Sequence, residues 1–489
     1  MISAIEQTRL KVSSLNDANK KSNLGQFFTP ASIASFMAGL FPEASGKCRL
    51  LDAGAGIGSL SSAFLERCEN GNLNFKEIKL KTFEIDLSIH DELHRSLLPY
   101  TRNCLYSIET MGGDFIEEAV SAIQTGSYDF THAIVNPPYK KITSHSRYRL
   151  LLREVGVETV NLYSAFVALI ISLAAPNGQI VAIIPRSFCN GPYYRPFRDF
   201  ILERSAIHHI HLFKSRSKAF KDDSVLQENI IIQLERGGKQ GPVKISTSTD
   251  DTFNDLVTHE YPFKRIVLPS DLERFIRIPT SLVPNIFERD TAICHTLEEL
   301  GIKVSTGPVV DFRLKQYLRN LPESDTAPLL YPAHASDGKI NWPIIGMKKP
   351  NAIEHNIDTE KWLYPIGFYC VVRRFSSKEE KRRIMASVVN PAIFGDSSML
   401  GFENHFNLFH ENKRGLSEAI ARGLTVFLNT SAVDEYFRCF NGHTQVNAMD
   451  LKQIRYPSRQ ALINLGEWAM EQGDMTQAMI DEQLIVLSA

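Results

Sequence analysis

The chain has 489 residues of ordinary globular composition, which is enough for two or three domains that each bury a core. Lys and Arg together number 54 against 55 Asp and Glu, so the net charge of -1 does not point to nucleic acid and any basic surface must be local. The seven cysteines are scattered without a Cys-x-x-Cys pair, which argues against a structural zinc or dithiol site. The N-terminus lacks the pattern of a signal peptide, and the longest apolar run, residues 162–175, is shorter than the ~20 residues that cross a bilayer. We therefore expect a cytoplasmic protein with no membrane partner.

Residues 1–22 are polar and are expected to form an N-terminal arm or a weakly ordered helix. The segment that follows reads Asn-Leu-Gly-Gln-Phe-Phe-Thr-Pro, and apolar residues then recur at helical spacing between Ile33 and Leu40. Thr29 suits the N-cap of this helix and Pro30 its first turn. Helix capping alone explains the segment, so any functional meaning depends on its neighbours.

A glycine-rich turn follows an apolar strand in residues 49–60, which read Arg-Leu-Leu-Asp-Ala-Gly-Ala-Gly-Ile-Gly-Ser-Leu. Gly54, Gly56 and Gly58 allow the backbone to approach a ligand closely, as in nucleotide-binding strand-to-helix turns. The spacing is not the Gly-x-Gly-x-x-Gly of dinucleotide sites. Asp52 at the end of the strand would repel a pyrophosphate but could attract an ammonium group.

Acidic residues end the next two predicted strands. Glu84, within Glu-Ile-Asp, is placed to accept hydrogen bonds from both hydroxyls of a ribose. Asp114, within Gly-Asp-Phe, could accept from the amino group of an adenine. Each acid alone is more often a solvated strand end, but their order after the glycine turn favours a pocket. The pattern fits an adenosine that carries a charged amino-acid tail and no phosphate.

A third strand end carries Asn136-Pro137-Pro138-Tyr139, directly after the apolar residues Ile134 and Val135. The prolines end the strand and leave a stiff loop at its carboxyl edge, where open α/β sheets bind ligands. The Asn136 side-chain oxygen and the Pro137 carbonyl are two acceptors that could draw an exocyclic amino group towards tetrahedral geometry. Tyr139 could stack on the ring that bears this group. The alternative is a plain proline loop with Tyr139 as a half-buried core residue.

Two histidines, His209 and His211, share one face of a later predicted strand and raise the question of a metal site. With no third ligand nearby, a metal is disfavoured. We expect no metal cofactor.

Residues 23–236 resemble the gamma class of N6-adenine DNA methyltransferases, the family of the TaqI modification enzyme. The Phe-Thr-Pro segment, the glycine turn, Glu-Ile-Asp, Gly-Asp-Phe and Asn-Pro-Pro-Tyr occur in the order of that family, followed by an Asn-Leu-Tyr-x-Ala-Phe helix. The resemblance implies a Rossmann-like α/β domain that binds S-adenosylmethionine as methyl donor, through Thr29, Asp52, Gly54, Glu84, Ile85, Asp114 and Phe115. It also implies that Asn136, Pro137, Pro138 and Tyr139 hold the target base and that Phe220 is a second stacking aromatic.

The glycine-rich turn at residues 237–242 is predicted to end this domain, so that residues 23–242 form the methyltransferase domain and 243–489 a mixed α+β target-recognition domain. Segments 304–313 and 441–447 are similar to parts of such recognition regions. Gln445 and Asn447 alternate so that both could contact adenine edges from one face of an extended segment, although either could simply satisfy a turn. The densest basic cluster offers phosphate contacts through Arg373 and Arg374 and comprises Arg373, Arg374, Lys378, Lys381, Arg382 and Arg383.

The expected activity is transfer of the methyl group of S-adenosylmethionine to N6 of a flipped-out adenine in double-stranded DNA. The expected setting is a restriction-modification system, with a separately encoded restriction endonuclease as a further partner. A protein-glutamine methyltransferase also uses Asn-Pro-Pro-Tyr, but the long region after residue 242 favours DNA. An RNA amino-methyltransferase and a non-catalytic DNA-binding subunit with a methylase fold remain alternatives.

Overall fold

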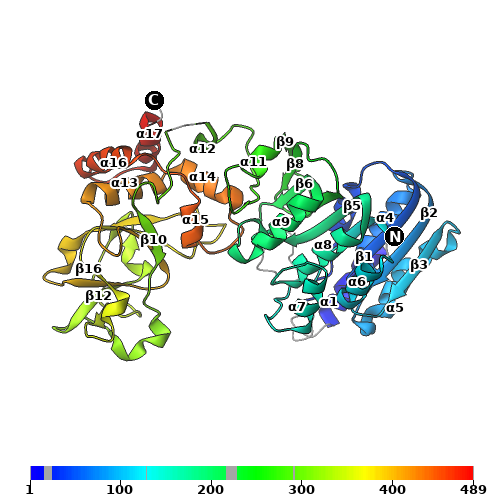
Figure 1. The fold of residues 1–489 in the computed structure, drawn as a ribbon, viewed down its shortest axis with the longest axis horizontal. Helices are drawn as coiled ribbons and strands as arrows, with labels where there is room; N and C mark the ends of the chain where they lie inside the picture. The colour runs from blue at the N-terminus through cyan, green and yellow to red at the C-terminus, as the bar shows by residue number, and fades with distance from the viewer. Residues whose placement is uncertain (1, 16–24, 128, 216–227, 290–291, 488–489) are drawn as a thin grey trace. The chain divides into compact units, whose positions relative to one another are not determined.

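The computed structural model describes residues 2–15, 25–127, 129–215, 228–289 and 292–487 (Figure 1). The chain divides into two compact units, Met1–Leu282 and Val283–Ala489, which are called unit 1 and unit 2 below. Within the described ranges, no helix has both the length and the apolar character needed to cross a bilayer.

Unit 1 is built on a nine-stranded sheet in the order β3-β2-β1-β4-β5-β7-β6-β8-β9. Strands β3, β2, β1, β4 and β5 pair in parallel, and β7 runs antiparallel to both β5 and β6. The strands are β1 (Ser45–Ala53), β2 (Asn74–Phe83), β3 (Tyr106–Met111), β4 (Phe130–Val135), β5 (Ala174–Pro185), β6 (Ser205–Phe213), β7 (Asn229–Arg236), β8 (Val243–Ser248) and β9 (Val257–Tyr261).

Helices cover both faces of this sheet, because successive strand residues bury their side chains on opposite sides. Leu50 belongs to the core under α3, α4 and α5, whereas Leu51 belongs to the core under α6, α8 and α9. The result is the three-layer Rossmann-like arrangement that the sequence predicted. The helices are α1 (Ile2–Leu15), α3 (Ala31–Gly39), α4 (Ser59–Glu69), α5 (His90–Leu97), α6 (Phe115–Thr125), α7 (Arg147–Glu154), α8 (Leu162–Leu173), α9 (Arg195–Arg204) and α11 (Phe263–Ile266).

The register of the parallel strands aligns their carboxyl ends. Ala53 pairs with Phe83, which pairs in turn with Met111, and Leu51 lies opposite Ala133, two residues before the end of each strand. The loops that follow β1, β2, β3 and β4 therefore emerge at one edge of the sheet.

The boundary predicted after residue 242 differs from the observed one after Leu282. The glycine-rich turn at 237–242 connects two strands of the same sheet, since β8 pairs in parallel with β6 and β9 pairs antiparallel with β8. Turn composition marks a reversal of the chain whether or not a domain ends there. The sheet, rather than the turn, sets the limit of unit 1.

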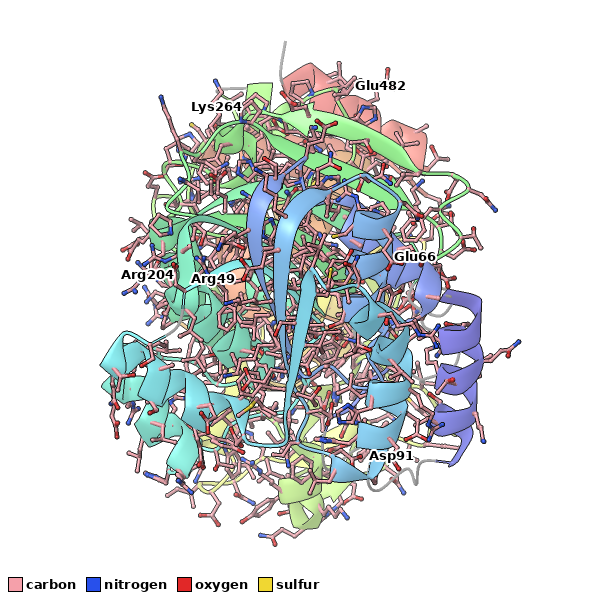
Figure 2. The ribbon with its side chains drawn as sticks, turned by 90° about the vertical axis from the view of Figure 1, so that its right-hand side faces the viewer. Arg49, Glu66, Asp91, Arg204, Lys264 and Glu482 are labelled. Carbon is pink, nitrogen blue, oxygen red and sulfur yellow. The ribbon has the colours of Figure 1, made fainter. Side chains whose placement is uncertain are left out.

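The predicted N-terminal arm is a helix over residues 2–15. Helix α1, the darkest blue helix in Figure 2, packs against α3 and α4. Ile5 and Val12 from α1 join Phe28, Ile57 and Ile89 in a small apolar cluster of their own. The first residues are therefore part of unit 1.

Unit 2 contains a six-stranded sheet, β10-β20-β17-β18-β14-β13, a five-stranded sheet, β11-β15-β12-β19-β16, and several helices. This is the mixed α+β texture that the sequence predicted. The strands are β10 (Lys303–Thr306), β11 (Leu318–Arg319), β12 (Thr326–Leu330), β13 (Ala335–Ser336), β14 (Lys339–Ile340), β15 (Ala352–Glu354), β16 (Leu363–Pro365), β17 (Tyr369–Arg373), β18 (Ala386–Val389), β19 (Met399–Phe402) and β20 (Phe406–His410). The helices are α12 (Ile286–Arg289), α13 (Glu418–Leu428), α14 (Ser431–Phe440), α15 (Ala448–Lys452), α16 (Arg459–Glu471) and α17 (Gln477–Leu487).

Candidate cofactor and substrate site

A cavity of about 470 Å³ opens at the edge of the unit 1 sheet where β1, β2, β3 and β4 end. This volume is in the range of small-molecule sites. The residues predicted from the sequence that line the cavity are Gly54, Gly56, Glu84, Ile85, Asp114, Phe115, Asn136 and Pro138. Of the described residues predicted to bind the cofactor or the target base, four do not line it: Thr29, Asp52, Pro137 and Tyr139.

The glycine turn needs glycine for both conformation and space. Gly54 and Gly56 have φ of +82° and +57°, a region that side chains rarely adopt. A side chain on Gly56 would also place its Cβ 3.1 Å from Cδ1 of Phe28. The turn is anchored from the neighbouring strand, since the Phe83 carbonyl accepts from the N–H of Gly54 at 2.8 Å.

Glu84 closes the turn from the end of β2. Its Oε2 accepts from the Gly56 N–H and its Oε1 from the Asp86 N–H, both at 2.8 Å. The carboxyl group is 5% exposed, and burial raises its pKa. Each carboxylate oxygen retains a second lone pair that a ribose hydroxyl could use.

One carboxylate oxygen of Asp114 caps the start of α6, and the other accepts a hydrogen bond from a tyrosine. Its Oδ1 accepts from the Ile116 N–H at 2.8 Å, while its Oδ2 accepts from the hydroxyl of Tyr148. Tyr148 lies on α7 and lines the cavity, and burial together with Asp114 raises its pKa. No motif in the sequence points to Tyr148.

Asp52 lies behind the cavity wall. Its side chain is fully buried, its Oδ2 accepts from the Ser61 hydroxyl at 2.6 Å, and its Oδ1 has no hydrogen bond from the described residues. Burial raises the pKa of this carboxyl to about 7. Asp52 therefore links the end of β1 to α4 through Ser61 and does not line the cavity.

Apolar side chains form the walls between the acids. Ile85 is 52% exposed although it is large and apolar, and it lines the cavity together with Phe115. Phe166 also lines the cavity and lies 4.9 Å from Phe115 between ring centroids. Phe166 is the last residue of the Asn-Leu-Tyr-x-Ala-Phe motif at the start of α8, for which the sequence predicted no role in the cavity.

The charges around the cavity are separated. Glu84 and Asp114 are acidic, whereas Lys140 and Lys141 come from the loop after β4. A flat adenosine between apolar walls, with a tail that carries both a cationic and an anionic group, satisfies both sets of charges. The residues present thus fit S-adenosylmethionine.

The Asn136 side chain is held at all its polar atoms. Its Nδ2 donates to the Phe27 carbonyl at 2.9 Å and to the Thr29 hydroxyl at 3.0 Å. Its Oδ1 accepts from the Tyr139 hydroxyl at 3.0 Å. Thr29 is also not the N-cap of α3, because that position is Pro30, which has no capping side chain.

Tyr139 is turned towards the protein. Its ring lies 5.7 Å from Phe27 and 6.3 Å from Tyr163 between centroids, and burial raises its pKa. The residue as a whole is half-buried. Phe220, the predicted second stacking residue, lies outside the described residues.

In unit 2 the structure brings Arg374 and Gln445 together. The Arg374 Nη2 lies 3.5 Å from the Gln445 Oε1, and Phe375 forms a β-bridge with Gln445. The ring of Phe375, 40% exposed, packs on His405 with centroids 4.9 Å apart. We call these four residues the Arg374–Gln445 patch.

Asn447 and part of the predicted basic cluster have structural partners instead. Asn447 is the N-cap of α15, and its N–H and Nδ2 both donate to Asp450 Oδ2, at 3.0 and 3.3 Å. Arg383 is 2% exposed and donates to Asn441 Oδ1, so the cluster is not one solvated face. Arg373 is half-buried, with its Nη2 3.8 Å from Glu380 Oε2.

His209 and His211 are core residues. Both share the hydroxyl of Ser246, at 2.6 and 2.8 Å, and His211 also contacts Ser248 at 3.2 Å. Among the described residues, no three His, Cys, Asp or Glu side chains gather where they could hold a metal ion.

The fold and the cavity define a Rossmann-like S-adenosylmethionine-dependent methyltransferase. Residues 58–220 match the model of the Eco57I restriction-modification methylase family. The chain is 50% identical to the type II methyltransferase M.BsuBI of Bacillus subtilis, over 99% of this chain and 97% of the relative. It is 40% identical to the type II methyltransferase M.PstI of Providencia stuartii, over 98% and 95% of the two chains. The chain therefore belongs to the type II DNA methyltransferases of restriction-modification systems.

Solved structures show the same fold at low identity. One is DrdV in complex with DNA, with a TM-score of 0.51 and 11% identity over 96% of this chain and 59% of that chain. Another is a nuclease-deletion mutant of the type ISP restriction-modification enzyme LlaGI, with a TM-score of 0.51 and 11% identity over 94% and 57% of the two chains.

Proposed function

We propose that the protein transfers a methyl group from S-adenosylmethionine to N6 of an adenine that is flipped out of duplex DNA. The observation that carries this proposal is the position of Asn136. Its amide lies at the cavity that Glu84 and Asp114 line, with both Nδ2 hydrogens directed to protein acceptors. The side-chain oxygen accepts from the Tyr139 hydroxyl and keeps a second lone pair for a substrate amino group.

The adenine amino group is a weak nucleophile, since its lone pair is delocalised into the ring. Asn136 Oδ1 and the Pro137 carbonyl accept its two hydrogens and stabilise the positive charge that develops on the nitrogen during attack. S-Adenosylmethionine supplies an electrophilic methyl group on a sulfonium ion. As the amino nitrogen attacks, the bond between sulfur and the methyl carbon breaks, the sulfur leaves as a neutral thioether, and the methylated nitrogen gives up one proton to water. Because this proton is lost after the positive charge has developed, positioning and these acceptors suffice and no strong base is required.

Flipping an adenine costs a few kcal/mol. Stacking of the base on Tyr139 contributes about 1 to 3 kcal/mol and so offsets part of this cost. Because the Tyr139 ring packs against Phe27, we propose that a flipped base takes the place of part of this packing. Glu84 binds the ribose hydroxyls of the cofactor, and Asp114 its adenine amino group.

Sequence specificity is proposed to lie in unit 2. The Arg374–Gln445 patch combines an amide that can pair with adenine, a guanidinium and an exposed aromatic ring. Arg373 and Arg374 are proposed to contact phosphates. A separately encoded restriction endonuclease that cuts the same sequence is the proposed partner in the cell.

The test is methyl transfer from labelled S-adenosylmethionine to three acceptors: duplex DNA of random sequence, RNA of matched sequence, and a glutamine-containing protein extract. Labelled DNA is digested to nucleosides, and the product is identified by mass spectrometry. The proposal predicts N6-methyladenine in DNA only. Label in RNA or protein, or a methylated cytosine, would contradict it.

A further inference from the structure

The side-chain amide of Asn136 has one favoured orientation. Both hydrogens on its Nδ2 have acceptors, the Phe27 carbonyl at 2.9 Å and the Thr29 hydroxyl at 3.0 Å. Rotating the amide by 180° would place Oδ1 against the Phe27 carbonyl, and two acceptors cannot share a hydrogen bond. The segment that contains Phe27 and Thr29 therefore keeps Nδ2 on its own side and leaves Oδ1 on the opposite side of the amide, where Tyr139 lies.

Helix α1 holds the segment that contains Phe27 and Thr29 in place. Helix α3 has Pro30 at its N-cap, which supplies no capping side chain. The N–H of Ala31 instead donates to Oε2 of Glu6, 25 residues earlier in the chain, at 2.9 Å. Glu6 is fixed in turn by Arg9, which donates from Nη2 to Oε1 at 2.6 Å and is itself 2% exposed. A charged pair on α1 thus caps the helix that begins two residues after Thr29.

Apolar packing supports the same arrangement. Ile5 and Val12 of α1 bury Phe28, the residue between the two acceptors of Asn136. Phe28 is 4% exposed and lies against α1 and Gly56, so it cannot move without displacing α1 or the glycine turn, and Thr29 beside it is 5% exposed.

We propose that Thr29 is a positioning residue that orients the Asn136 amide, and that α1 holds it in place through Glu6. This inference rests on the proposed role of Asn136 as acceptor for the target amino group. It differs from the family resemblance, which implies that Thr29 binds the cofactor. Two observations favour positioning: Thr29 does not line the cavity, and its hydroxyl already accepts from Asn136.

The test uses the full chain with Thr29→Val, which keeps the shape but removes the acceptor, and Thr29→Ser, which restores it. Single-turnover methyl transfer is measured at saturating DNA and cofactor, and cofactor affinity by calorimetry. Thr29→Val is expected to lower the transfer rate about tenfold while the Kd for S-adenosylmethionine changes less than twofold. Thr29→Ser should recover most of the rate. Weaker cofactor binding with an unchanged transfer rate would overturn the proposal.

Glu6 provides a matched pair of variants. Glu6→Gln keeps an oxygen that can accept from Ala31, whereas Glu6→Ala removes it. We expect Glu6→Ala to lower the transfer rate in the same direction as Thr29→Val, with Glu6→Gln between it and the unaltered protein. Equal rates for the two Glu6 variants, at equal thermal stability, would overturn the part assigned to α1.

A readout without catalysis separates this inference from the proposed function. In protein labelled with ¹⁵N-asparagine, the Asn136 side-chain hydrogens, assigned with Asn136→Ala, should exchange slowly with solvent. Thr29→Val should deprotect one of them. If DNA is not methylated but this change occurs, the proposed function fails and the orientation by Thr29 stands. If exchange is the same in both proteins, the orientation by Thr29 is wrong.

Discussion

Tyr139 donates its phenol hydrogen to Oδ1 of Asn136 at 3.0 Å, and the same hydroxyl lies 3.2 Å from the Ile183 carbonyl oxygen. The acceptor and the aromatic ring proposed to act on one base therefore belong to one hydrogen-bonded unit. An amide oxygen has two lone pairs, so Oδ1 can accept from a substrate amino group beside Tyr139.

The ring and the hydroxyl of Tyr139 can be separated by two substitutions. Tyr139→Phe removes one neutral hydrogen bond, worth about 1 kcal/mol, and should retain transfer within about tenfold of normal. Tyr139→Ala also removes about 1 to 3 kcal/mol of stacking and should be much slower.

The fluorescence of 2-aminopurine at the target position reports base flipping for both Tyr139 variants. Tyr139→Phe should give a signal near that of the unaltered protein and Tyr139→Ala a weaker one. Equal signals from the two variants would speak against a stacking role.

Glu84 is predicted to control cofactor affinity. Glu84→Ala removes the acceptor of the Gly56 N–H as well as the proposed acceptor of the ribose hydroxyls. Hydrogen bonds to a charged group are worth about 1.5 to 3 kcal/mol, so affinity should fall by about 10- to 100-fold. Calorimetry with S-adenosylmethionine measures this, with Glu84→Gln as an intermediate control. An unchanged affinity for Glu84→Ala would refute the assignment.

Gln445 should contribute to sequence-specific DNA binding, whereas Arg373 should contribute to binding of any DNA sequence. Gln445→Ala is expected to cost about 1 to 3 kcal/mol on cognate DNA only. Arg373→Ala should weaken cognate and scrambled duplexes alike and reduce the salt slope by about one. Binding titrations across a salt series distinguish the two effects.

Asn447→Ala is the matched control for Gln445→Ala. Since Asn447 is the N-cap of α15, loss of its side chain should lower the free energy of unfolding by about 1 kcal/mol without changing the preference for cognate DNA. If Asn447→Ala relaxes specificity while Gln445→Ala does not, the Arg374–Gln445 patch does not recognise the DNA sequence.

Buried histidines should make unit 1 sensitive to acid. Burial lowers the pKa of His132 and His209 to about 4 and that of His211 to about 3, from 6.5. Between pH 6.5 and 4 the unfolded chain binds more protons than the folded one, so the free energy of unfolding falls as the pH falls through this window. Asp52 acts in the opposite sense: with its folded pKa raised to about 7, its contribution is present below pH 3.8 and lost as the pH rises to 7.

Three histidines oppose two carboxyls, because burial raises the pKa of Glu84 as well as that of Asp52, and the larger number of histidines predicts a urea midpoint that drops from pH 7 to pH 5. His211→Phe places an apolar ring among Phe36, Phe213 and Phe253 and should make this pH dependence shallower. A midpoint that is constant between pH 7 and 5 would contradict the prediction.

Local sequence predicted much of unit 1, because the end of a strand and a turn that needs positive glycine φ angles both leave a recognisable pattern of residues. Gly56, Glu84 and Asp114 each follow a parallel strand, and a parallel sheet must bring such positions to one edge. The class of fold and most of the cavity walls followed from this rule.

Long-range contacts account for what the sequence did not reveal. The hydrogen bond between Tyr148 and Asp114 spans 34 residues, and that between Glu6 and Ala31 spans 25. No periodicity or motif encodes such pairs. The domain limit was missed for the same reason, since only the pairing of β8 with β6 shows that the sheet continues beyond residue 242.

The single-turnover methyl transfer rate of Asn136→Ala on cognate DNA tests the proposed mechanism most directly. Cofactor affinity and thermal unfolding are measured on the same variant. Removing a group that stabilises developing charge should lower the rate by about 10²- to 10³-fold. The fold and cofactor binding should be largely kept, because Asn136 follows the strand on a loop outside the core. Near-normal transfer by Asn136→Ala would contradict the proposed mechanism.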